Sequence, residues 1–74
     1  MSNVITESAL LGRIRRNFAK DGMRIRRGVH PIGPHERQWL YIDTATGTIT
    51  GATDDLERLG REIGVLKPGE SVAA

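Results

Sequence analysis

The chain has 74 residues, of which 38% are hydrophobic and 27% charged, with no cysteine and a formal net charge of +2. This composition is typical of one small globular domain, and it excludes disulfides, thiolate metal sites and thiol nucleophiles. No apolar stretch approaches the roughly 18 residues of a membrane span, and the first residues lack the regions of a secretory signal. We therefore expect a cytoplasmic protein of a bacterial type that does not contact membranes.

The first predicted element is a helix that begins after Thr6 and stops at Gly22. Thr6 can cap the N-terminus, and Gly22 can adopt the left-handed conformation that ends a helix. Apolar residues recur at three- and four-residue spacing and predict a buried stripe made of Leu10 or Leu11, Ile14 and Phe18. Gly12 lies inside this helix, where it costs about 1 kcal/mol relative to Ala unless a close contact requires it.

Three short strands are predicted next, over residues 23–28, 38–43 and 48–52, because apolar and polar residues alternate there. A loop of about ten residues, which contains Pro31 and Pro34, separates the first strand from the second. A turn that ends at Gly47 separates the second strand from the third.

A second helix is predicted over residues 53–66. Thr53 or Asp54 is expected to cap it, and Asp54 with Glu57 has the spacing of a capping box. Its buried stripe consists of Leu56, Leu59 and Ile63. Gly64 is expected to end this helix.

The order α-β-β-β-α predicts an α+β domain, with a three-stranded antiparallel sheet and both helices packed on one face. We expect residues 1–66 to form a single domain and residues 67–74 to form a disordered C-terminal tail. The aliphatic residues of the strands are expected to be buried together under the helices: Met23, Ile25, Leu40, Ile42 and Ile49. The open face would then carry Arg24, Arg26, Trp39, Tyr41, Thr48 and Thr50, since the opposite register buries arginines.

Basic residues concentrate in the first half of the chain. Eight of them face only two acids between Arg13 and Arg37, a net charge of +6, whereas the segment from Gln38 onward has a net charge of −3. Seven of the eight are arginines, which suit contacts with phosphate and stacking on bases. This asymmetry points to an anionic partner, although a solvated charged surface produces the same pattern.

The predicted function is a small non-enzymatic binding module that binds nucleic acid through the first helix and the open sheet face. Aromatic rings beside arginines form a stacking platform for single-stranded nucleic acid. The candidate residues are Arg13, Arg16, Arg24, Arg26, Arg27, Trp39 and Tyr41. Two alternatives stay open: a protein–protein adaptor for an acidic partner, or a homodimer through the Trp39 and Tyr41 face.

No residue pattern predicts an enzyme, a cofactor or a metal ion. Asp54, Asp55 and Glu57 lie at a helix start, where capping and the helix dipole account for carboxylates. The chain has no glycine-rich phosphate loop, and its two histidines, His30 and His35, are too few for a metal site.

The element order resembles that of the double-stranded RNA-binding domain, and Gly33-Pro34-His35 before Trp39 is similar to a signature of that family. The resemblance implies a last helix that begins with lysines and grips phosphates. This chain has Thr53-Asp54-Asp55 there instead, and the histidine is one position off. We therefore assign no membership in that family.

Overall fold

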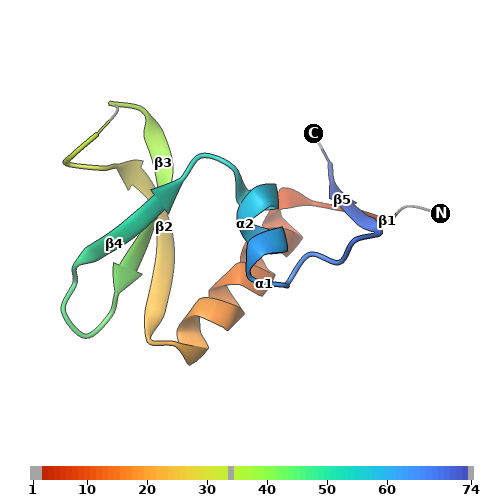
Figure 1. Cartoon of the computed structure of the whole chain (residues 1–74), viewed down its shortest axis with the longest axis horizontal. Helices are drawn as coiled ribbons and strands as arrows, with labels where there is room; N and C mark the ends of the chain where they lie inside the picture. Colours follow the sequence, from red (N-terminus) through yellow and green to blue (C-terminus); the bar gives the residue numbers. More distant parts are fainter. Residues whose placement is uncertain (1–2, 34, 74) are drawn as a thin grey trace.

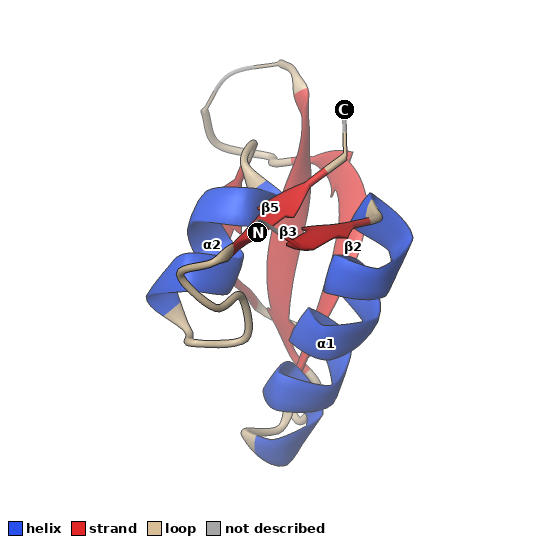
Figure 2. Cartoon of the chain, turned by 90° about the vertical axis from the view of Figure 1, so that its right-hand side faces the viewer, coloured by secondary structure: helices blue, strands red, loops and turns tan. Residues whose placement is uncertain are grey.

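The computed structural model describes residues 3–33 and 35–73; Pro34 of the predicted loop lies outside the described residues. The elements are β1 (Asn3–Ile5), α1 (Glu7–Lys20), β2 (Met23–Val29), β3 (Arg37–Asp43), β4 (Ile49–Thr53), α2 (Leu56–Glu62) and β5 (Glu70–Val72). An antiparallel sheet has the order β2-β3-β4, and β1 pairs with β5 in a small parallel sheet. Both helices lie on one face of the three-stranded sheet, between it and the parallel pair (Figures 1 and 2). The predicted α+β fold is therefore confirmed.

Helix α1 begins where the sequence predicts. The Thr6 hydroxyl accepts a hydrogen bond from the Ala9 N–H at 3.0 Å, and Gly22 follows the helix with a φ of 68°. The predicted stripe is buried, and its members are Leu10, Ile14 and Phe18. Neither described helix is long and apolar enough to cross a membrane.

Helix α2 is shorter than predicted and begins later. Its cap is Asp55, whose carboxylate accepts a hydrogen bond from the Arg58 N–H at 3.1 Å, so the prediction of Thr53 or Asp54 is wrong. The reason is that β4 continues through Thr53, which keeps that residue in extended backbone. The predicted end is confirmed, because Gly64 has a φ of 79° and follows the last turn.

The two helices approach each other closely at Gly60. A Cβ atom added there would lie 2.8 Å from Leu10 Cδ1 and 3.3 Å from Leu66 Cβ, and all three residues are buried. At Gly12 the nearest such atom is Arg16 Nη1, at 3.9 Å. Gly60, and not Gly12, is therefore the helical glycine that allows the two helices to pack closely.

Alanine substitutions at these two glycines should have opposite effects on the free energy of unfolding. Gly12→Ala should raise it by up to about 1 kcal/mol, because helix propensity improves without a steric cost. Gly60→Ala should lower it by about 1–2 kcal/mol, because overpacking against Leu10 exceeds the same gain in propensity. Urea unfolding followed by circular dichroism measures both. Equal stabilisation by the two variants would contradict the close helix–helix contact.

The predicted register of the sheet is wrong. Ile25 lies opposite Tyr41, and Arg27 lies opposite Trp39. Directly opposed residues share one face of a sheet. The two aromatic residues therefore share the helix-facing side with Met23 and Ile25, and they do not lie on the open face.

Leu40, Ile42 and Ile49, predicted to lie under the helices, are on the other face. Leu40 lies opposite Arg26, while Ile42 lies opposite Arg24 and Ile49. The prediction failed because it assumed that only one face of the sheet is apolar. The β2–β3 connection sets which residues oppose each other. In this chain, odd-numbered residues of β2 lie opposite odd-numbered residues of β3, and even-numbered residues lie opposite even-numbered ones, so each set shares one face.

The helix-facing aromatics pack into the core. The Tyr41 and Phe18 rings meet edge to face, with centroids 5.3 Å apart and an interplanar angle of 85°. Gly51 lies opposite Tyr41, and a Cβ atom there would be 2.8 Å from Tyr41 Cδ2, so the glycine leaves room for the ring. Such aromatic pairs contribute roughly 0.5–1.5 kcal/mol beyond the area that they bury.

The C-terminal segment is ordered, which corrects the prediction of a disordered tail over residues 67–74. Residues 70–72 form β5, and the Ala73 N–H donates to the Ile5 carbonyl at 2.8 Å. Val72 and Ile5 are partly buried against the core. This strand pair has little signal in the sequence, because each strand has three residues and its partner lies at the other end of the chain. Ala74 lies outside the described residues.

Candidate nucleic-acid interface

Arg13 anchors the C-terminal segment. Its guanidinium donates two hydrogen bonds to the Glu70 carboxylate, at 2.8 and 3.1 Å, and a third to the Val65 carbonyl at 3.1 Å. The Glu70 carboxylate also accepts from the Lys67 N–H at 2.9 Å. Only 10% of the Glu70 side chain is exposed. Because these partners occupy its guanidinium, Arg13 is not available to a phosphate in this structure.

This ion pair should make stability depend on pH. Hydrogen bonds from Arg13 and from the Lys67 N–H lower the pKa of Glu70 from 4.5 to about 2. Since the folded-state pKa is the lower one, the stabilisation is complete above pH 4.5 and is lost as the pH falls toward 2. The difference in unfolding free energy between the wild-type protein and Glu70→Gln should therefore shrink over that range.

Urea titrations of both proteins at several pH values between 2 and 6 would test this. Subtraction of the two curves removes the contribution of the other carboxylates, because both proteins contain them. A difference that stays constant over the whole range would show that Glu70 is not stabilised as a carboxylate.

Arg27 lies on the helix-facing side of the sheet, and its guanidinium carbon is 5.1 Å from the centroid of the Trp39 ring. Both residues line a groove of about 370 Å³. Four carboxylates line the same groove: Glu7, Asp54, Asp55 and Glu57. Because these acids outnumber the one guanidinium, the groove repels phosphate.

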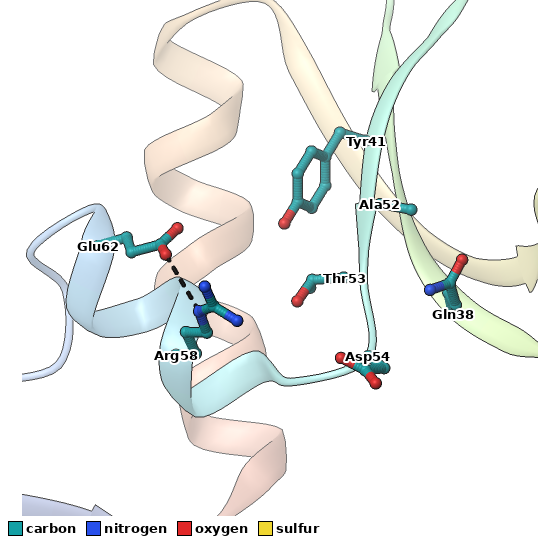
Figure 3. Close-up of a pocket in the computed structure, with 7 residues that line it drawn as sticks. All are labelled: Gln38, Tyr41, Ala52, Thr53, Asp54, Arg58 and Glu62. Carbon is teal, nitrogen blue, oxygen red and sulfur yellow. Dashed lines mark ion pairs between the residues drawn. The ribbon is translucent and has the colours of Figure 1, made fainter. Parts of the chain in front are cut away.

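Tyr41 borders a second groove, of about 410 Å³, between β4 and α2 (Figure 3). Its hydroxyl and that of Thr53 point toward the helix (Figure 3), and burial raises the pKa of Tyr41. Among the described residues lining this groove, one is a cation, Arg58, which pairs with Glu62 at 3.4 Å. Asp54 adds a further negative charge, so this groove does not suit an anion either.

The aromatic platform expected from the sequence is therefore absent from the open face. Trp39 and Tyr41 are partly buried and pack against the helical core. A homodimer in which two sheets meet through these rings would require the helices to leave. The geometry removes the physical basis of both the stacking platform and this dimer.

We call the face of the three-stranded sheet that points away from the helices the open face. Its residues, placed by strand pairing, are Arg24, Arg26, Gly28, Gln38, Leu40, Ile42, Ile49 and Ala52. Both arginines are exposed, and none of these described residues is acidic. Within the part of the chain that the structure describes, neither arginine of the open face takes part in an ion pair, in contrast to Arg13.

The centre of the open face is apolar and closed to solvent. Leu40 is 1% exposed and Ile42 is 4% exposed, although neither belongs to the core cluster under the helices. The arginines lie directly opposite these two residues, so their aliphatic stems are placed to cover them while the charged heads reach water. Arg24 and Arg26 lie two residues apart on the edge strand β2, so both side chains belong to the same face.

The structure thus separates the residues that the sequence analysis grouped together. Arg24 and Arg26 share the open face, whereas Arg27 lies on the opposite, helix-facing side of the sheet. Arg16 is exposed on α1, which covers that helix-facing side. Sequence reasoning missed Gln38, which lies on the open face opposite Gly28. Gln38 lies two residues before Leu40, so both belong to the same face of β3. The predicted register placed that face under the helices, and Gln38 was therefore not recognised as a residue of the open face.

No protein family, curated protein or solved structure matches this chain. Within residues 3–33 and 35–73, no three histidine, cysteine or acidic side chains come together as metal ligands. His30 has a local role, since its Nδ1 accepts a hydrogen bond from the Ile32 N–H at 2.9 Å. The open face and its two arginines are therefore the basis for a functional assignment.

Proposed function

We propose that this protein is a small non-enzymatic binding module whose open face binds double-stranded nucleic acid. The observation that carries this proposal is the pair Arg24 and Arg26, exposed side by side on a face with no acid among its described residues. Guanidiniums in such a setting attract phosphate, while the acidic groove beside Trp39 lies behind the sheet. The charge distribution thus favours one orientation toward an anionic partner.

A duplex suits this surface better than a single strand. Single strands are held largely by bases that stack on exposed aromatic rings. The open face has no aromatic residue among those described, because Trp39 and Tyr41 pack toward the helices. A duplex instead presents regularly spaced phosphates and groove edges, which arginines contact without stacking.

Fluorescence anisotropy with a labelled duplex and with one of its single strands tests this proposal. We expect the protein to bind the duplex more tightly at about 50 mM salt, and to lose affinity steeply as the salt is raised to about 200 mM. Preference for the single strand would indicate a stacking surface that the proposal excludes. Absence of binding to either oligonucleotide at low salt would refute the nucleic-acid function.

A further inference from the structure

We infer that Arg24 and Arg26 reach into the major groove of B-form DNA and each contact a guanine, so that the protein prefers two guanines about two base pairs apart. This inference rests on the proposed function. It adds sequence recognition to a surface that could otherwise act by charge alone. It assigns the two arginines to base edges on preferred sequences and to phosphates on other sequences.

The spacing of the arginines supports this assignment. Residues two apart on a strand lie on the same face, separated by about 6.8 Å, which is twice the rise of about 3.4 Å per residue. Successive bases along one DNA strand also rise by about 3.4 Å. The spacing of Arg24 and Arg26 therefore equals the axial rise of two base steps, and their long flexible side chains span the sideways displacement that the winding of the groove adds.

The position of β2 also allows the approach. It is an edge strand that pairs with β3 alone, so its outer side is open within the described part of the chain. Two strands lie about 4.8 Å apart, and the major groove is about 12 Å wide, so β2 and β3 fit inside it. Gly28 and Ala52 are small, Leu40 and Ile42 are buried, and Gln38 and Ile49 are only partly exposed. The two arginines are therefore the long exposed side chains of this surface.

The chemistry of the side chains selects guanine. An arginine fork donates two hydrogen bonds to the O6 and N7 atoms of guanine, and this pair is the commonest specific contact in the major groove. A lysine keeps the positive charge but loses the planar fork. The A-form groove of double-stranded RNA is too narrow and deep for side chains to read, so the inference applies to DNA.

Sequencing of bound DNA from a library of duplexes with a randomised centre provides the test, with the wild-type protein, Arg24→Lys and Arg26→Lys. We expect the wild-type protein to enrich two guanines about two base pairs apart, and each variant to lose enrichment at one of them. Replacement of either guanine by 7-deazaguanine in a selected duplex should weaken binding about tenfold, and this measurement leaves the protein unchanged.

The outcomes separate the inference from the proposed function. Salt-dependent duplex binding without sequence enrichment would overturn base reading and leave the proposed function standing. Equal enrichment from a double-stranded RNA library would overturn the assignment to the B-form major groove. Absence of binding to every duplex would overturn both.

Discussion

Replacement of Leu40 by alanine should lower the free energy of unfolding by about 2–5 kcal/mol. Leu40 is 1% exposed although neither helix covers it, so its burial depends on the neighbouring side chains of the open face. Truncation removes the centre of that packing and leaves a cavity beside Gly28, whose added Cβ would lie 3.1 Å from Leu40 Cδ1. A chain of this length has a total stability of about 4–11 kcal/mol, so this variant should lose a large fraction of its stability and unfold at a markedly lower temperature and urea concentration.

Val29→Ala is the matched control for this prediction. Val29 belongs to the same sheet but is 49% exposed, so its truncation should change stability by no more than about 0.5 kcal/mol. Thermal and urea unfolding of the two variants give the comparison. If Leu40→Ala costs no more than Val29→Ala, the open face lacks a packed apolar centre.

Removal of the charges of Arg24 and Arg26 should weaken duplex binding by at least about tenfold at low salt and reduce the steepness of the salt dependence. The double variant Arg24→Met and Arg26→Met keeps unbranched stems over Leu40 and Ile42, so the fold should persist. Each phosphate contact contributes about −0.9 to the slope of log affinity against log salt. Loss of two contacts should therefore change the slope by about 2.

The duplex for this measurement should contain A·T pairs only, because the arginines then have no guanine to contact and bind phosphates. The control is the double variant Arg15→Met and Arg16→Met, which removes the same charge from exposed positions on α1, behind the sheet. We expect the control to keep most of the affinity. Equal losses in both double variants would mean that net charge, and not the open face, determines binding.

Local signals were sufficient to predict most of the fold. Thr6 caps α1 and Gly64 ends α2 because capping depends on residues within one helical turn. The stripe of Leu10, Ile14 and Phe18 follows from helical periodicity, and these residues are buried. The α+β order was predictable for the same reason, since each element has its own periodicity and its own boundaries.

Contacts between distant parts of the chain could not be predicted from such local patterns. The pairing of β1 with β5 and the bond from Arg13 to Glu70 join residues 57 or more positions apart. Three-residue strands carry too little pattern to predict, and an arginine on a helix looks the same whether it binds a carboxylate or solvent. The ordered C-terminal segment and the pairing of Arg13 with Glu70 were therefore both outside what the sequence predicted.

The sequence by itself determined the helices, the three central strands and the concentration of arginines before residue 38. Only the tertiary structure decided which arginines act together, because a loop that shifts pairing by one residue exchanges the two faces of a strand. That pairing turned Trp39 and Tyr41 toward the helices and left Arg24 and Arg26 on the open face. The candidate ligand changed with it, from a single strand that stacks on rings to a duplex that meets arginines.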